Sequence, residues 1–254
     1  MSAVRGALAG QVAIVTGAGR GIGHAVALAL AREAASVVLA ARARQELAMA
    51  AATIRESGGT ALAIPTDVTQ DGAVEAMVEQ AIAEFGRVDI LVTAAGVASF
   101  GPVVGTKPSD WDAQLAVNLR AVMVSCRAVL PVMIRQHRGT IINIASVAAQ
   151  RAIPGAAVYT ATKAGVVGFS RVLAEELRAE RVRVGVLVPG AVDTPLWDSI
   201  GSPPDRGAER RDPAGACRAA TDRPPSAARR GAAGLIAGAQ ARLAKLRPVT
   251  RDAR

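Results

Sequence analysis

The stretch Gln11–Gly23, with the sequence Gln-Val-Ala-Ile-Val-Thr-Gly-Ala-Gly-Arg-Gly-Ile-Gly, decides the expected fold of this chain. Its first part is a short apolar, β-branched run that is typical of a buried strand, and the residues from 21 to 32 follow a helical pattern. Glycines between strand and helix permit a tight turn and a close approach to a pyrophosphate, while the helix N-terminus supplies free N–H groups. The stretch therefore predicts a dinucleotide-binding turn, with the candidate contact residues Thr16, Gly17, Gly19, Arg20, Gly21, Ile22 and Gly23.

Strand-like and helix-like segments alternate along the chain as far as residue 200. Further strands are expected at residues 36–40, 61–64, 89–93, 140–145 and 182–188, and helices near 44–57, 71–85, 109–136 and 157–180. Regular alternation of this kind predicts right-handed βαβ units and a Rossmann-type, doubly wound parallel sheet. We therefore expect a single α/β domain over residues 1–200, in which Pro131 kinks or ends its helix.

The composition changes near residue 201. Of the 54 residues from 201 to 254, 14 are Ala and 11 are Arg, whereas Leu, Ile and Val together number 5. Such a segment buries too little apolar surface to offset its ordering entropy, so we expect a disordered tail without a buried strand. Its excess of Ala, Arg, Pro and Gly also resembles GC-rich coding sequence read out of frame, which gives the hypothesis of a frameshift near residues 206–210.

Charge and cysteine usage exclude several classes of function. The net charge of +9 is concentrated in the tail, which holds 12 Lys and Arg against 5 Asp and Glu without interleaved aromatic residues, so we expect no nucleic-acid partner. No run reaches the roughly 18 apolar residues of a membrane span. Cys126 and Cys217, like His24 and His137, lack metal-type spacing, so we expect free thiols, no metal site and a cytoplasmic protein.

Tyr159 and Lys163 stand four residues apart, and Ser146 ends the apolar run at residues 140–145. Residues i and i+4 share a helical face, and a nearby cation lowers a tyrosine pKa, which suits the hydroxyl for acid–base catalysis. The end of a parallel strand is where α/β sheets place reactive groups, so the three side chains are expected to meet at one carbonyl oxygen. Alternatively, Tyr159 is a half-buried ring beside a solvated charge, but it is the only Tyr in the chain.

The segment after the second expected strand, Ala40-Ala41-Arg42, predicts the cofactor preference. It has no Asp or Glu at its end to bind the ribose 2′-hydroxyl of NAD, whereas Arg42 suits a 2′-phosphate. We therefore expect NADP(H) to be preferred over NAD(H). The alternative is that Arg42 and Arg44 are solvated residues at a helix start.

Together these motifs resemble the classical short-chain dehydrogenase/reductase family over about residues 8–200. The turn at residues 16–23 matches the family's TGxxxGxG pattern. The resemblance implies four catalytic residues, Asn118, Ser146, Tyr159 and Lys163. In it Tyr159 donates a proton to the substrate oxygen, Lys163 lowers the pKa of Tyr159 and holds the nicotinamide ribose, Ser146 orients the carbonyl, and Asn118 anchors a water relay. It also implies the cofactor contacts Asp67, Val68, Ala94, Ala95, Gly96, Tyr159, Lys163, Pro189, Gly190, Val192 and Thr194.

The chain departs from the family pattern at three places. Thr93-Ala94-Ala95-Gly96 replaces the family's Asn-Asn-Ala-Gly, which removes two amide side chains that usually brace the central strands. Ala34 stands where a helix-ending Gly is common and requires another C-cap solution. The family's seventh strand is not readable after residue 200, so the sixth is expected to form an exposed edge.

The resemblance also implies the reaction, a hydride transfer between NADPH and a ketone or alcohol. Residues 1–200 are most similar to 3-oxoacyl-acyl-carrier-protein reductases and broad ketone reductases, so a 3-oxoacyl thioester or similar ketone is the expected substrate. A polyol or hydroxy-acid dehydrogenase and a catalytically compromised NADP-binding protein stay open as alternatives. Trp197 either lines the substrate pocket or covers the core, and the family implies a homodimer or homotetramer.

Overall fold

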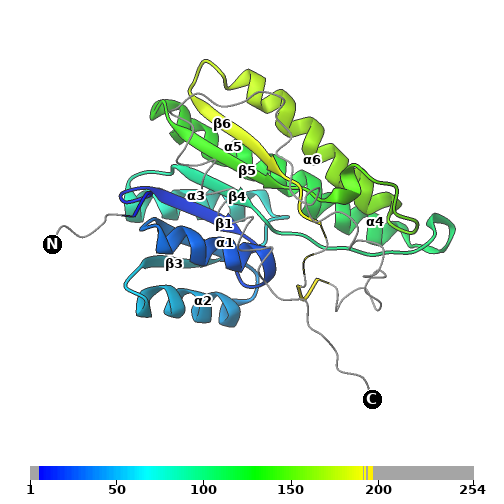
Figure 1. Cartoon of the computed structure of the whole chain (residues 1–254), viewed down its shortest axis with the longest axis horizontal. Helices are drawn as coiled ribbons and strands as arrows, with labels where there is room; N and C mark the ends of the chain where they lie inside the picture. Colours follow the sequence, from blue (N-terminus) through cyan, green and yellow to red (C-terminus); the bar gives the residue numbers. More distant parts are fainter. Residues whose placement is uncertain (1–5, 191, 193, 197–254) are drawn as a thin grey trace.

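Six apolar segments form one parallel sheet in the computed structural model, which describes residues 6–190, 192 and 194–196. The sheet has the strand order β3-β2-β1-β4-β5-β6 (Figure 1). The order in which strands are added thus reverses between β1 and β4, as in doubly wound folds, although all strands are parallel. The strands are β1 (Val12–Thr16), β2 (Ser36–Ala41), β3 (Thr60–Pro65), β4 (Ile90–Thr93), β5 (Gly139–Ile144) and β6 (Val182–Leu187).

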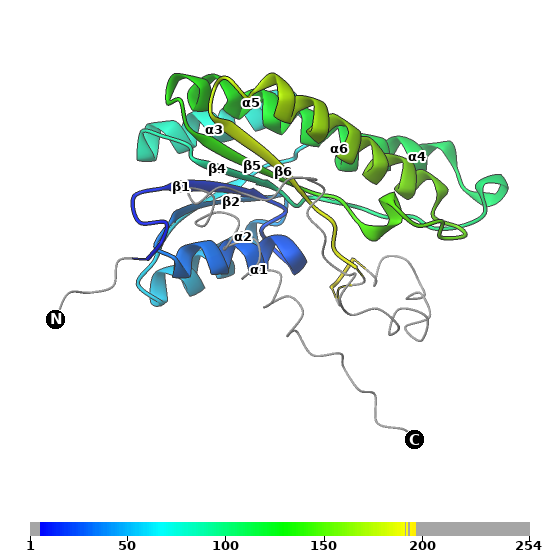
Figure 2. The same ribbon diagram turned by 45° about the horizontal axis from the view of Figure 1, so that its top comes forward.

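The helices between these strands cover both faces of the sheet. Figure 2 shows α1 and α2 on one face and α3, α5 and α6 on the other. The predicted Rossmann-type α/β fold is therefore confirmed. The helices are α1 (Gly21–Arg32), α2 (Arg44–Glu56), α3 (Asp71–Phe85), α4 (Pro108–Leu115), α5 (Ala121–Arg135) and α6 (Ala157–Glu176), with short 3₁₀ turns η1 (Val103–Gly105) and η3 (Val147–Ala149) and the π turn η2 (Ala116–Arg120).

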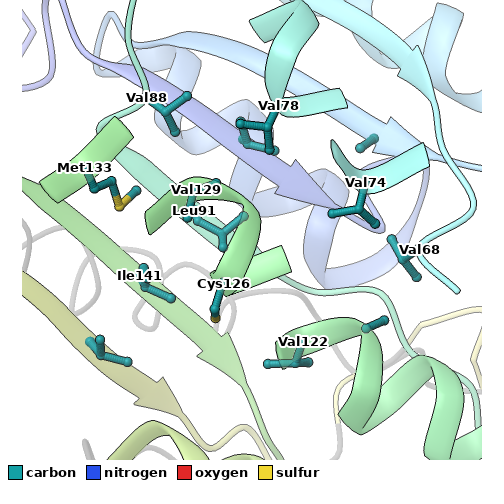
Figure 3. Close-up of a cluster of buried hydrophobic side chains, with 14 of the residues drawn as sticks. Val68, Val74, Val78, Val88, Leu91, Val122, Cys126, Val129, Met133 and Ile141 are labelled. Carbon is teal, nitrogen blue, oxygen red and sulfur yellow. The ribbon is translucent and has the colours of Figure 1, made fainter. Parts of the chain in front are cut away.

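Two apolar clusters hold the layers together, one on each face of the sheet. In the cluster of α3, α5 and α6, Val78 and Val129 lie near the strand residues Leu91 and Ile141 (Figure 3). The second cluster joins α1 and α2 to β1 and β2. Because both faces are covered, the central strands β1 and β4 are apolar rather than alternating and are buried at every residue.

Of the two outcomes predicted for Pro131, a kink or the end of its helix, the end does not occur. Proline removes one backbone N–H from the helical ladder, but α5 continues past it to Arg135 and keeps Val132 and Met133 buried. The irregular point lies instead at η2, where the helix widens into a π turn around Asn118.

One helical stretch in the described part of the chain, Pro108–Arg135, is long and apolar enough by length and composition to cross a membrane. Its α5 portion contributes Val122, Val129 and Met133 to the buried cluster against the sheet.

The C-cap of α1 is formed without glycine. Ala34 adopts the left-handed conformation, with φ 66°, and its N–H donates to the carbonyl of Ala31 while the N–H of Ala35 donates to Leu30. The alanine itself thus takes the position that glycine usually fills, at a steric cost of roughly 1 kcal/mol.

At one edge of the sheet, β6 pairs with β5 alone among the described strands. The predictions about residues 201–254 lie outside the described residues.

Candidate active site

A cleft of about 910 Å³ opens at the carboxyl ends of the strands. It runs past the point where β1 and β4 lie side by side and the strand order reverses, which is the usual ligand site of doubly wound sheets. The glycine-rich turn lines one part of the cleft, and Ser146, Tyr159 and Lys163 line another. The tertiary fold thus brings both predicted groups of residues into a single cavity.

The glycine-rich turn has the shape of a pyrophosphate cradle. Gly17 has φ 68°, and a Cβ there would lie 2.7 Å from the backbone nitrogen of Ala95. A Cβ on Gly23 would lie 2.2 Å from the carbonyl oxygen of Gly17, so the turn and α1 touch backbone to backbone. The N-terminus of α1 has no side-chain cap and no acidic residue in its first turn. Its N–H groups and positive dipole are therefore available to an anion, and the residues present fit a dinucleotide.

Thr16 connects the turn to the neighbouring strand end. Its hydroxyl accepts hydrogen bonds from the N–H groups of Ala94 at 3.2 Å and Ala95 at 3.4 Å. Ala94, Ala95 and Gly96 follow β4 and line the cleft beside the turn. This part of the wall is thus made of backbone and small side chains, which allows the close approach that the sequence predicted.

The predicted adenosine end of the cleft is lined by Arg42, Asp67 and Val68. The Asp67 carboxylate accepts from the N–H of Thr69 at 3.0 Å and from its hydroxyl at 2.8 Å. These hydrogen bonds, with a smaller contribution from Arg42, hold the pKa of Asp67 below its usual value. Asp67 is therefore ionised and oriented near neutral pH. Glu46, in the first turn of α2, lines the same region and was missed by the sequence reasoning.

Tyr159 lies near the N-terminus of α6, with its ring edge-on to Phe100 at a centroid distance of 5.6 Å. Burial raises the pKa of Tyr159, and a hydrogen bond with the Ser146 hydroxyl acts in the opposite direction. The Lys163 ammonium lies 5.7 Å from the ring centroid and donates to the carbonyl of Ile144 at 3.0 Å. The expected lowering of the Tyr159 pKa by Lys163 is therefore not seen, and burial outweighs the opposing effect of Ser146.

Ser146 faces Tyr159 from the end of β5. Its backbone is extended, with φ −164°, and its hydroxyl oxygen accepts from the N–H of Ala148 at 3.2 Å at the start of η3. The next residue, Val147, donates its N–H to the carbonyl of Pro189 at 3.0 Å. Hydrogen bonds within η3 and to the segment after β6 therefore hold the backbone that carries this hydroxyl.

Asn118 is fully buried in the π turn η2 and fixes the segment after β4. Its side-chain oxygen accepts from the N–H of Val97 at 2.9 Å, and its amide donates to the Val97 carbonyl at 2.8 Å. A longer contact of 3.4 Å joins the amide to the Thr162 hydroxyl on α6. π turns of this kind are frequent at functional sites. The predicted water relay at Asn118 stays a prediction.

A buried polar network braces the central strands in place of the two amide side chains that are missing at Thr93-Ala94. Thr93 donates its hydroxyl to the side-chain oxygen of Asn143 at 2.8 Å, and Asn143 donates to the Ser170 hydroxyl at 2.9 Å. The network joins β4, β5 and α6 behind the cleft. A signal existed in the sequence, since an Asn within the apolar run Thr-Ile-Ile-Asn-Ile must find partners when buried.

The segment after β6 closes one side of the cleft, with Pro189, Gly190, Val192 and Thr194 all in its lining. The side chain of Thr194 lies 3.4 Å from where a Cβ on Gly21 would stand, so this segment meets the N-terminus of α1. Of the predicted contacts in the glycine-rich turn, all but Thr16 and Gly23 line the cavity, namely Gly17, Gly19, Arg20, Gly21 and Ile22. Trp197 lies outside the described residues.

The burial of Lys163 can be tested through the pH dependence of the free energy of unfolding. Burial lowers its pKa from 10.5 to about 8, so between these values the unfolded chain holds a proton that the folded chain has lost. The contribution of this residue to the free energy of unfolding therefore rises with pH in that window, by on the order of 3 kcal/mol. Below the window, the full cost of burying the charged ammonium remains. We expect the free energy of unfolding of the wild type to gain this amount over Lys163→Met between pH 7 and pH 10.5, measured by denaturant titration.

The exposed Lys107 gives the matched control, Lys107→Met. An equal pH dependence of the wild type and Lys163→Met would contradict the burial of an ionisable ammonium at this site.

Comparisons with known proteins agree with this geometry. The sequence model described as short chain dehydrogenase matches residues 11–205. A 3-oxoacyl-[acyl-carrier-protein] reductase of Synechocystis sp. is 38% identical over 199 residues, which cover 78% of this chain and 81% of the relative.

Solved structures give the same relationship. A metagenomic short-chain oxidoreductase in complex with NADP is 44% identical with a TM-score of 0.70, covering 73% of this chain and 85% of that one. An NAD⁺-bound xylitol dehydrogenase is 34% identical with a TM-score of 0.71, covering 72% and 71%. With its nucleotide cradle and its Ser146–Tyr159 pair in one cleft, the chain therefore belongs to the short-chain dehydrogenase family of nucleotide-dependent oxidoreductases that act on CH–OH groups.

Proposed function

We propose that the protein is an NADP(H)-dependent reductase of a 3-oxoacyl thioester or similar ketone. One observation carries the proposal: a single cleft is lined both by the glycine-rich turn, whose backbone forms a pyrophosphate cradle, and by Ser146 and the half-buried Tyr159. The bound nicotinamide would supply the hydride that this chemistry requires. The protein's own residues supply orientation and a proton.

In the direction of ketone reduction, Tyr159 is the proton donor. Burial raises its pKa, so the phenol holds its proton at neutral pH and can release it to an oxygen that gains negative charge. The Ser146 hydroxyl, beside it, orients the same oxygen. The Lys163 ammonium donates to the Ile144 carbonyl at 3.0 Å and lines the same cleft, where it would hold the nicotinamide ribose.

The preference for NADP(H) is tested at Arg42. Its guanidinium lines the adenosine end of the cleft and would bind a 2′-phosphate through a charge-assisted hydrogen bond of about 1.5–3 kcal/mol. We expect Arg42→Ala to lower the ratio of kcat/KM for NADPH to that for NADH by about 10- to 100-fold. Arg44→Ala is the matched control, since Arg44 is exposed and does not line the cleft. A ratio unchanged by Arg42→Ala would overturn the assignment.

The substrate class is tested with a panel of β-ketoacyl thioesters, simple ketones and sugars, each supplied with NADPH. The similarity to a 3-oxoacyl-[acyl-carrier-protein] reductase supports thioesters as the expected substrates. Inactivity on every thioester would remove them, and activity on sugars alone would favour a polyol dehydrogenase, in line with the similarity to a xylitol dehydrogenase. Cofactor binding without turnover of any substrate would contradict the proposed reductase.

A further inference from the structure

Glu46 lies at the junction between the glycine-rich turn and the end of β2. Its carboxylate oxygen Oε2 is 2.7 Å, and its Cβ 3.1 Å, from where a Cβ on Gly19 would stand. The Cβ of Ala41, the last residue of β2, lies 3.7 Å from the same point. Because Gly19 has no side chain, the carboxylate of a residue on α2 can reach the cleft wall here.

This junction is where dinucleotide-binding folds distinguish their cofactors. An acidic residue beside it accepts a hydrogen bond from the ribose 2′-hydroxyl, whereas a basic residue binds a 2′-phosphate. The chain has no acid at the end of β2, but α2 begins at Arg44 and its first turn carries Glu46 to the same wall. The site therefore holds a carboxylate as well as the guanidinium of Arg42.

The Glu46 carboxylate is half-buried and lacks an ion-pair partner among the described residues. Arg20 and Arg42 also line the cleft, but neither forms an ion pair with Glu46 among the described residues. Asp67 accepts its hydrogen bonds from Thr69. An uncompensated carboxylate against a backbone turn is thus left facing the cavity.

We propose that Glu46 opposes Arg42 in cofactor selection: its carboxylate accepts a hydrogen bond from the 2′-hydroxyl of NAD(H) and repels the 2′-phosphate of NADP(H). The inference rests on the proposed dinucleotide function of the cleft. It assigns the cofactor preference to a balance between two side chains rather than to Arg42 alone. Glu46 also lies near the positive end of α2, where a carboxylate stabilises a helix whatever binds in the cleft. The test must therefore separate selectivity from stability.

Glu46→Gln removes the charge and keeps an acceptor oxygen of similar size. We expect it to raise the NADPH/NADH ratio of kcat/KM about tenfold, mainly through NADPH, because one charge-assisted interaction is altered. Glu46→Ala also removes the acceptor, so it should weaken NADH binding as well. Glu56→Gln, at the exposed C-terminal end of the same helix about 15 Å away, is the matched control.

Binding without turnover gives the second measurement. Calorimetric titration of each variant with adenosine 2′,5′-bisphosphate and with 5′-AMP isolates the 2′-phosphate. We expect Glu46→Gln to tighten the bisphosphate about tenfold and to leave 5′-AMP within twofold, with Glu56→Gln unchanged. A lower melting temperature with an unchanged bisphosphate/AMP ratio would assign Glu46 to helix stability and overturn the inference. Failure of the wild type to bind either nucleotide, or NADPH, would instead overturn the proposed function.

Discussion

Tyr159→Phe is expected to lower kcat by about 10³-fold, within the range of 10²- to 10⁴-fold that general acid–base catalysis contributes. The substitution removes the hydroxyl that meets Ser146 and keeps the ring that packs edge-on against Phe100 at 5.6 Å. Steady-state kinetics with NADPH and the best substrate of the panel measure the change. Because the ring remains, the melting temperature and the Kd for NADPH should stay close to those of the wild type.

Thr160→Val serves as the control for Tyr159→Phe. It removes a hydroxyl from the next residue of α6, which does not line the cleft, and should leave kcat within about twofold. If Tyr159→Phe kept more than about a tenth of the wild-type kcat, its hydroxyl would not be the proton donor. Loss of NADPH binding in the same variant would point to a structural role of the hydroxyl.

Gly23→Ala is expected to have the largest effect on cofactor binding. The new Cβ would stand 2.2 Å from the carbonyl oxygen and 2.7 Å from the carbonyl carbon of Gly17, and both are backbone atoms that cannot rotate away. Overpacking of this kind costs about 1–3 kcal/mol. The turn must then separate from α1, which displaces the N–H groups that form the cradle. We expect the Kd for NADPH, measured by fluorescence titration, to rise about 100-fold, together with a fall in the free energy of unfolding of about 3 kcal/mol.

Gly168→Ala makes the same chemical change at a harmless position. Gly168 is exposed in α6, and a Cβ there would meet no heavy atom within 4 Å, so alanine should stabilise the helix by roughly 0.5–1 kcal/mol. Unchanged NADPH affinity in Gly23→Ala would show that the turn and α1 are not held in the backbone contact described above.

Much of the architecture follows from local sequence patterns. The apolar runs around β1 and β5 and the helical segments between strands are strong signals, because a parallel sheet covered on both faces needs continuous apolar strands. Pro131 shows the limit of such rules: tertiary packing of Val132 and Met133 holds α5 together beyond a residue that by itself disfavours helix. The π turn at Asn118 is likewise fixed by contacts with Val97, which is 21 residues away in sequence.

The sequence by itself determined the parallel α/β fold and the glycine-rich turn, because glycine conformation and hydrophobic periodicity are local properties. The catalytic roles of Ser146, Tyr159 and Lys163 stay predictions from their spacing. The tertiary structure decided how deeply these side chains are buried and which groups surround them. Burial, a property of the whole packed chain, raises the pKa of Tyr159 and lowers that of Lys163. The approach of Glu46 to Gly19 depends on how α2 packs beside the turn, so the charge that faces the cofactor site could be seen only in three dimensions.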